Sequence, residues 1–350
     1  MRSFADLDRT LAQVPAEVVR HLRTIDTGAG TEQLYAHQAP ARLSELAHRA
    51  RIESVTASSE IEGVTVPDPG RARRIIEGRA TTLRTRDEEQ LAGYRAALDH
   101  LFQDDWRPLT LGLVLHVHRL LWSYTASPGG QLKSSDNLVV DRAPDGSVTV
   151  RFRPVPADRT EFHLHELVER YVAARADDRH HPVLLVGLFV LDLLVVHPFE
   201  DGNGRVARAL ATALLSDAGY GVGRWVSVEQ LIAQRADGYY GALLASTHGW
   251  HDDEADPWPW LAYFTGVLAD AYRLFAARAA GATRTRSTKQ QRVSMWILEQ
   301  APVFFTVDEA RTAVPGVSDQ TIRLVLNALR DAGRIEADGP GRSARWRRLG

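Results

Sequence analysis

The chain has 350 residues, of which 44% are hydrophobic, a formal net charge of −2 and no cysteine. This composition is typical of a globular protein with about two or three domains, and the lack of cysteine excludes disulfides, thiolate metal sites and a cysteine nucleophile. Residues 283–350 carry twelve basic and seven acidic side chains, a net charge of +5, so the rest of the chain carries −7. The C-terminal end is therefore the part that favours anions.

The start of the chain, MRSFADLDRTLAQVP, has early acidic residues and no apolar run. It does not resemble a secretory signal, so we expect a cytoplasmic protein. The most apolar stretch, residues 183–196, is fourteen residues long and contains Asp192. Because a membrane span needs about 20 apolar residues, we expect no membrane partner and interpret this stretch as a buried helix.

Residues 1–100 show the apolar spacing of helices and form a predicted N-terminal helical region. Residues 101–275 form the predicted core, and its helical pattern is interrupted once. Within residues 129–156, the runs NLVV and SVTVRF flank a turn built from Pro and Asp-Gly, which predicts a β-hairpin inserted between helices. A hairpin buries little by itself, so we expect it to lie against the helices with one edge free. The expected fold is mainly α.

Residues 276–290 are small and basic and predict a linker. In residues 291–350, three helical segments precede two short strands around DGPGR, which is the order of a winged helix-turn-helix domain. Ser318 is the expected N-cap of the third helix, and Gly333 is its expected stop.

Such a domain contacts DNA through its third helix and its wing. Arg323 lies on the predicted third helix, and Arg342 and Arg345 lie in the predicted wing. We therefore expect DNA as a partner. The alternative is that this domain binds proteins or only packs.

The sequence HPFEDGNGRVAR follows the apolar stretch directly. Gly202, Asn203 and Gly204 at the start of a helix expose unpaired N–H groups at the positive end of the helix dipole, where anions bind. Arg205 and Arg208 add two guanidinium groups, which suit phosphate oxygens. Together these groups favour a polyphosphate over a single carboxylate.

Asp201 precedes this anion site, where a carboxylate can hold a Mg²⁺ ion that bridges phosphates. His197 ends the apolar helix, and the ordinary histidine pKa of about 6.5 suits a general base that takes a proton from a hydroxyl. Each residue taken alone also fits a structural role, as a hydrogen-bonded histidine or a turn. Their combination within one short segment predicts an active site, whereas His118 is expected to be structural.

This segment matches the pattern HPFx[D/E]GNGRxxR at every defining position, and the chain therefore resembles the Fic family. The resemblance implies a Fic-type helical bundle that transfers AMP from ATP to a Ser, Thr or Tyr hydroxyl of a target protein, with release of pyrophosphate. It implies that His197 is the general base, that Asp201 holds Mg²⁺, and that residues 202–204 form the phosphate site with Arg205 and Arg208.

The sequence SSEIEG ends a predicted helix, with Gly63 as a plausible stop. It also fits the inhibitory pattern of the family, [S/T]xxxE[G/N], through Ser58, Glu62 and Gly63. The resemblance implies that Glu62 pairs with Arg208. A carboxylate bound there occupies the guanidinium and repels the γ-phosphate, so we expect an enzyme that is inhibited in its resting form.

The resemblance is looser elsewhere. The hairpin stands where the family has a flap that guides the target, and DGYYGAL makes Tyr239 and Tyr240 candidates for the adenine pocket, with helix packing as the alternative. A target that is the chain itself and a homodimer are both compatible with the sequence. The alternatives to protein adenylylation are a nucleotide-sensing transcription regulator that binds DNA, transfer of another phosphate-containing group, and removal of AMP.

Overall fold

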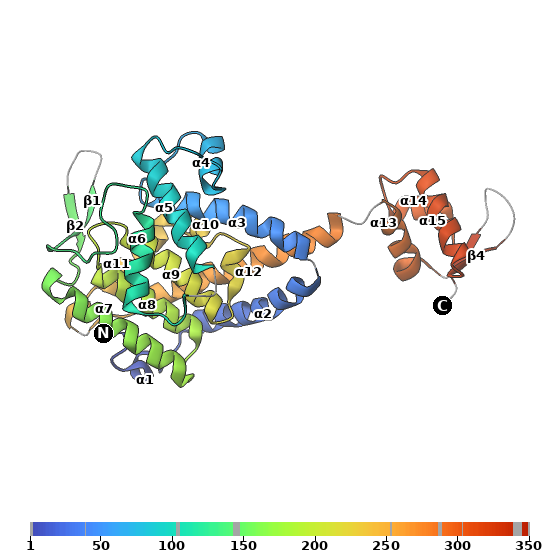
Figure 1. Ribbon diagram of the computed structural model, residues 1–350. Helices are drawn as coiled ribbons and strands as arrows, with labels where there is room; N and C mark the ends of the chain where they lie inside the picture. Colours follow the sequence, from blue (N-terminus) through green and yellow to red (C-terminus); the bar gives the residue numbers. More distant parts are fainter. Residues whose placement is uncertain are drawn as a thin grey trace. The chain divides into compact units, whose positions relative to one another are not determined.

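The computed structural model describes residues 3–38, 40–102, 106–142, 148–252, 254–285, 289–302, 304–338 and 345–348. The chain divides into two compact units, residues 1–277 and 278–350, and its described part is mainly helical with two small sheets (Figure 1). The mainly α fold class predicted from the sequence is therefore confirmed.

The larger unit is a bundle of helices that carries one hairpin. Its elements are α1 (Leu7–Thr10), α2 (Ala16–Gln38), α3 (Pro40–Ile61), α4 (Pro69–Ile76), α5 (Arg86–Leu101), α6 (Leu111–Leu121), β1 (Val139–Arg142), β2 (Val148–Phe152), α7 (Ala157–Asp177), α8 (Pro182–Val196), α9 (Asn203–Asp217), η2 (Gly221–Arg224), α10 (Val228–Ala233), α11 (Ala236–Thr247), η3 (Trp250–Asp252) and α12 (Trp258–Thr285). The division between the two units falls within α12, after residue 277.

Helix α8 is the centre of this unit. It begins with Pro182, whose fixed φ suits the first helical position, and the His181 side chain accepts a hydrogen bond from Val183 N. Nearly all of its side chains are buried, because a helix that is apolar on every side must be covered all round. Helices α7 and α9 pack against it. Within the described residues, no helix combines the length and apolar character that a membrane crossing requires.

The predicted hairpin is present. Strands β1 and β2 pair antiparallel, with Val140 opposite Val150 and a register irregularity between Val139 and Val140. Helix α11 packs against β2, so the hairpin lies on the helical body as expected. The predicted turn between the strands falls on residues 143–147, outside the described residues.

Two predicted boundaries differ from the structure. Residues 1–100 do not stand apart from residues 101–275, because α5 packs against α6 and α9 within one unit. The predicted linker, residues 276–290, is helical as far as Thr285, where α12 ends. The alanines and arginines that suggested a linker are strong helix formers, so they extend α12 instead.

In its described residues, the smaller unit contains three α-helices, a π-helical turn that continues the first of them, and a three-stranded antiparallel sheet of order β3-β5-β4. Its elements are α13 (Lys289–Met295), the π-helical turn η4 (Trp296–Gln300), β3 (Phe304–Phe305), α14 (Val307–Ala313), α15 (Asp319–Asp331), β4 (Ile335–Asp338) and β5 (Arg345–Arg348). The sequence predicted all of these except β3, which at two residues is too short to show strand alternation.

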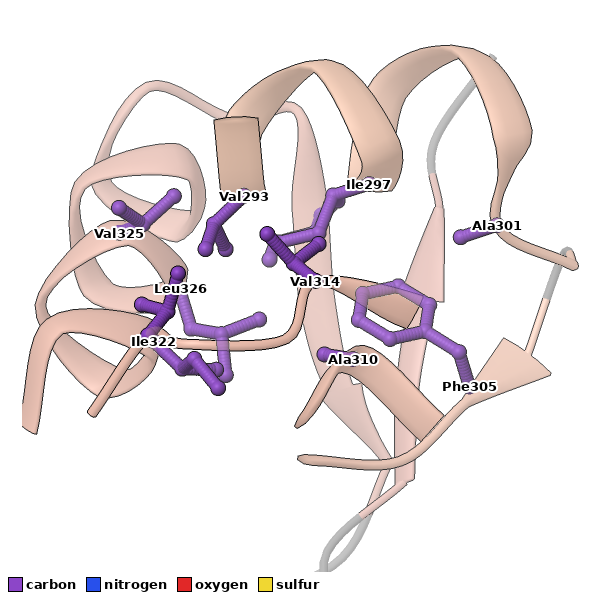
Figure 2. Packing of buried hydrophobic residues seen from close by; sticks show 11 residues of the cluster. Val293, Ile297, Ala301, Phe305, Ala310, Val314, Ile322, Val325 and Leu326 are labelled. Carbon is purple, nitrogen blue, oxygen red and sulfur yellow. The ribbon is translucent and has the colours of Figure 1, made fainter. Parts of the chain in front are cut away.

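Helix α15 is capped as predicted. Ser318 accepts a hydrogen bond from Thr321 N, and Gly333 just beyond the helix has a left-handed φ of 66°. The apolar face of α15 presents Ile322 and Leu326 to a core that includes Val293 and Phe305 (Figure 2). The unit therefore has a hydrophobic core of its own.

Candidate active site

His197 stands at the carboxyl end of α8 in a left-handed conformation, with φ of 48°. Its backbone N–H donates to Leu193 O at 3.0 Å, and its ring Nδ1 lies 3.1 Å from Leu194 O. Because a carbonyl oxygen only accepts, Nδ1 carries the proton and donates it to this carbonyl. The lone pair of the neutral ring is therefore on Nε2, where a base needs it.

The pKa of His197 is lowered to about 4, chiefly because the ring is buried. The carbonyl of Leu194 works against this shift, and the charge of Lys133 adds to it. The imidazole is therefore neutral at pH 7 and able to accept a proton. Its left-handed backbone has a cost of order 1–3 kcal/mol for a residue that is not glycine, so the surrounding contacts must impose it.

The loop after His197 is held by Asn203. The side chain of Asn203 accepts from Phe199 N at 2.9 Å and donates to Phe199 O at 2.8 Å. The ring of Phe199 is buried and stacks on His118, with centroids 3.7 Å apart. His118 accepts from Gly130 N and lies 3.0 Å from Asp201 O. Asn203 and His118 thus stabilise the loop. A structural role was expected for His118, whereas Asn203 was expected to form part of the phosphate site.

Helix α9 opens on this loop. Gly202 is its N-cap, with φ of 85° and no side-chain cap, so the N–H groups of its first turn are available to an anion. A Cβ added at Gly202 would lie 2.7 Å from Leu121 Cδ2, and one added at Gly204 would collide with Glu62 Oε1. The missing side chain at Gly204 therefore leaves room that the Glu62 carboxylate takes.

Arg208 is buried and bound to the end of α3. Its Nε donates to Ser58 Oγ at 2.9 Å, and its Nη2 donates to Ser58 O at 3.0 Å and to Glu62 Oε1 at 2.8 Å. Burial would raise the pKa of Glu62, but Arg208 outweighs it and lowers that pKa below its usual value. Gly63 ends α3 with a left-handed φ of 75°. The structure thus places the predicted Glu62 and Arg208 in contact.

Arg205 points elsewhere. Its Nη1 donates to Gln90 Oε1 at 2.8 Å, its guanidinium lies over the ring of Trp122, and its Nη2 is 3.7 Å from Asp201 Oδ1. It does not line the cavity that Arg208 lines. Arg205 therefore stands behind the loop, where it supports Asp201, and not beside Arg208 as the sequence suggested.

A cavity of about 400 Å³ is lined by residues from the end of α8, the start of α9, α11 and the hairpin, and by Glu62 after α3. Six residues singled out from the sequence line it: Glu62, His197, Gly204, Arg208, Tyr239 and Tyr240. Burial raises the pKa of Tyr239 to about 12, although the nearby charge of Arg208 lowers it. The volume lies within the usual range for small-molecule sites of about 300–1,000 Å³.

The hairpin lines this cavity, which the sequence did not indicate. Leu138, Val140, Arg151 and Phe152 line it, and the guanidinium of Arg151 lies 4.3 Å from the ring centroid of Tyr240. The alternating residues of the hairpin predicted strands, but only the fold shows that the hairpin lies beside the motif.

Asp201 is the candidate magnesium ligand. Its side chain is 60% exposed and its Oδ1 accepts from Gly202 N at 2.6 Å. Among the described residues, no cluster of three His, Asp or Glu side chains could hold a metal. A single exposed carboxylate fits an ion that takes its other ligands from water and from nucleotide phosphates, as Mg²⁺ commonly does.

The arginines proposed for DNA contact lie in the smaller unit. Arg323 on α15 and Arg345 on β5 are exposed. Arg342 is outside the described residues.

The fold and the cavity define a class of helical protein. In this class a buried helix ends in a neutral histidine, and the start of the next helix lines the same cavity as that histidine. The Fic/DOC family model matches residues 108–215, which contain the hairpin, α8 and the histidine motif. These residues therefore form a Fic/DOC family domain.

Curated relatives match a longer part of the chain. The protein adenylyltransferase Fic of Drosophila grimshawi is 27% identical over 223 residues, which are 62% of this chain and 44% of the fly protein. The protein of the same name from Aedes aegypti is 30% identical over 179 residues, which are 49% of this chain and 33% of the mosquito protein. The chain thus spans less than half the length of these relatives.

Solved structures share the fold. A Fic family protein from Desulfovibrio desulfuricans has a TM-score of 0.63 at 23% identity and is matched over 97% of both chains. A Fic domain containing signaling protein from Bacteroides thetaiotaomicron has a TM-score of 0.59 at 21% identity, over 76% of this chain and 97% of that one.

Proposed function

We propose that the protein is an adenylyltransferase that moves AMP from ATP to a hydroxyl side chain of a protein and is inhibited by Glu62. The observation that carries the proposal is the single cavity lined by His197, Gly204, Arg208 and Glu62. The names of the fly and mosquito relatives support the same activity.

In the proposed reaction, His197 Nε2 takes the proton of a Ser, Thr or Tyr hydroxyl. The hydroxyl oxygen forms a bond to the α-phosphorus of ATP, the bond from that phosphorus to the bridging oxygen breaks, and pyrophosphate leaves. A positioned general base of this kind contributes about 10²- to 10⁴-fold to a rate. Because His197 is neutral over most of the pH range, it is ready to act without first losing a proton.

The phosphates are proposed to bind at the start of α9. Its N–H groups and the approach left open by Gly204 suit phosphate oxygens, and Arg208 suits the end of the chain of phosphates. Mg²⁺ held by Asp201 would offset phosphate charge. Asn203 and Arg205 act by fixing the loop, while Tyr239 and Tyr240 are proposed to contact adenine and the hairpin to guide the target.

Inhibition follows from the contact between Glu62 and Arg208. The carboxylate occupies the guanidinium group and the space in front of Gly204. It also places a negative charge where phosphate oxygens must come. Removal of the Glu62 side chain is therefore expected to free both the cation and the space.

The test uses ATP labelled at the α-phosphate or at the γ-phosphate, incubated with the protein and with a cell lysate. Glu62→Gly is expected to increase α-label in protein, and His197→Ala in the same protein is expected to abolish it. Label from the γ-phosphate would instead indicate phosphoryl transfer. If Glu62→Gly transfers no label from any nucleotide tried, the transferase proposal fails and a nucleotide-sensing role replaces it.

A second function, DNA binding, is proposed for the smaller unit. Its three helical segments and three-stranded sheet follow the order of a winged helix-turn-helix domain, and Arg323 and Arg345 are exposed on its third helix and last strand. Gel-shift titrations at several salt concentrations test it. Arg323→Ala and Arg345→Ala are expected to weaken binding and reduce its salt dependence, whereas Arg49→Ala, which removes the same charge from α3, is expected to do neither. Equal effects of all three variants would contradict the assignment.

A further inference from the structure

The ammonium group of Lys133 is buried at the root of the hairpin, shortly before β1. Its Nζ donates to Asn137 Oδ1 at 3.0 Å, to Val155 O at 2.6 Å and to Val196 O at 3.2 Å. An ammonium group has three N–H donors and no acceptor, so each donor here has a partner. A neutral amine has only two N–H groups and would leave one of these acceptors without its donor.

The contact with Val196 concerns the peptide unit that precedes His197. The C=O of this unit accepts from Lys133 Nζ, and its N–H donates to Leu193 O at 3.0 Å. The unit is therefore held on both sides. Its orientation sets φ of His197, which has the left-handed value of 48° that surroundings must impose on a residue with a side chain.

The backbone around Lys133 joins the hairpin to the motif loop. Lys133 N donates to Pro198 O at 2.9 Å, Ser134 N donates to Glu200 Oε1 at 3.1 Å, and Asn137 Nδ2 donates to Phe199 O at 3.0 Å. Lys133 contributes both its backbone N–H and its side chain to the hydrogen bonds between the hairpin root and the motif loop. Displacement of the hairpin root would therefore disturb the loop that carries the base.

We propose that Lys133 is a positioning residue for the general base: its protonated side chain fixes the peptide unit before His197 and so directs the Nε2 lone pair into the cavity. Lys133 does not line the cavity, so it acts through His197 and not on the nucleotide. A cation also suits this place because the last carbonyls of α8 form the negative end of the helix dipole. The effect on transfer rests on the proposed function, but the effect on His197 does not.

If the charge of Lys133 positions His197, the rate of transfer depends on the protonation of Lys133 and therefore on pH. Burial lowers the pKa of Lys133 to about 8, while the carboxylates of Asp136 and Glu200 raise it. Among the described residues, His197 also lies near enough for the Lys133 charge to lower its pKa. Above about pH 8 the side chain loses a donor and its charge, so the rate of transfer is expected to be level near neutral pH and to fall as Lys133 deprotonates.

The first experiment needs no activity. The chain contains two lysines, Lys133 and Lys289, so the full chain labelled with ¹³C,¹⁵N-lysine gives two side-chain signals, which Lys289→Arg assigns. The Lys133 signal is expected to titrate near pH 8, with ammonium protons that exchange slowly with water. A signal that titrates near pH 10.4, as for a solvated lysine, with fast exchange, would overturn the proposal.

The second experiment compares Lys133→Gln, Lys133→Arg and the control Lys289→Gln, each in Glu62→Gly protein. In Lys133→Gln the rate of transfer is expected to fall about 10- to 100-fold, the effect of misplacing a reacting group by about 1 Å, with the KM for ATP within about twofold of the parent. Lys133→Arg keeps its charge at every pH, so it is expected to retain more of the rate and to lose the alkaline fall.

Histidine-labelled protein separates this proposal from the proposed function. In folded Lys133→Gln protein, the His197 ring signals are expected to shift and to titrate at higher pH than in the parent. Unchanged His197 signals would overturn the proposal, whatever happens to transfer. If the signals change as expected but no parent protein transfers AMP, the positioning role stands and the proposed reaction fails.

Discussion

Replacement of Glu62 by glycine in protein that also carries His197→Ala tests the inhibitory contact through ATP binding alone, since no transfer can follow. Arg208 Nη2 donates to Glu62 Oε1 at 2.8 Å, and the same oxygen fills the space beside Gly204. A triphosphate must displace this carboxylate. A hydrogen bond to a charged group contributes about 1.5–3 kcal/mol, which corresponds to a gain of about 10- to 100-fold in ATP affinity when the carboxylate is absent.

The assay is calorimetric titration of ATP in the presence of Mg²⁺. The matched control is Glu60→Gly, also with His197→Ala, because Glu60 is an exposed glutamate at the same helix end. Without ATP, the Glu62 variant is expected to melt a few degrees lower, since Arg208 loses its carboxylate partner. Saturating ATP is expected to restore stability. ATP binding no tighter in the Glu62 variant than in the Glu60 control would show that Glu62 does not block the nucleotide site.

Three further predictions concern the Glu62–Arg208 pair, the space beside Gly204 and the hydrogen bond from α3 to Glu229. Arg208 lowers the pKa of Glu62 in the folded protein, although burial alone would raise it. The ion pair therefore stabilises the fold at pH values above the ordinary glutamate pKa of about 4.5. This stabilisation is lost as the pH falls through the lower pKa that Glu62 has in the folded protein. The difference in unfolding free energy between wild type and Glu62→Gln, measured by denaturant titration, should therefore shrink toward zero in acid, and a constant difference would contradict this. Gly204→Ala puts a Cβ where phosphate must approach, 3.0 Å from Arg208 Nη1, so it should abolish labelling even in Glu62→Gly protein; retained labelling would place the phosphates elsewhere. Ser54 Oγ donates to the buried Glu229 at 2.8 Å, and Ser54→Ala should destabilise the protein by about 1–3 kcal/mol and, by loosening α3, raise labelling to a level below that of Glu62→Gly. Destabilisation without any added labelling would show that α3 is not held through Glu229.

The sequence identified the residues that meet in the cavity because their spacing is local. His197, Gly204 and Arg208 belong to one short segment, and an apolar helix that ends in histidine indicates where that segment begins. Glu62 lies far away along the chain, and only the family pattern connected it to Arg208. The hairpin and the elements of the smaller unit other than β3 also followed from local signals, namely turn residues, caps and apolar spacing.

The directions of side chains could not be predicted in the same way. Arg205 and Asn203 have chemistry that suits phosphate, yet Arg205 turns to Gln90 and Asn203 turns back to Phe199. These partners come from tertiary packing, which a short motif does not contain. The helical extension of α12 has a similar cause, because alanine and arginine suit an exposed helix as well as a linker.

The most direct test of the central claim, that Glu62 blocks a phosphate site beside His197, is a crystal structure of Glu62→Gly, His197→Ala protein grown with ATP and Mg²⁺. Phosphate density is expected at the start of α9, within hydrogen-bond distance of Arg208. Nucleotide bound away from α9, or an empty cavity with Arg208 unmoved at saturating ATP, would contradict it.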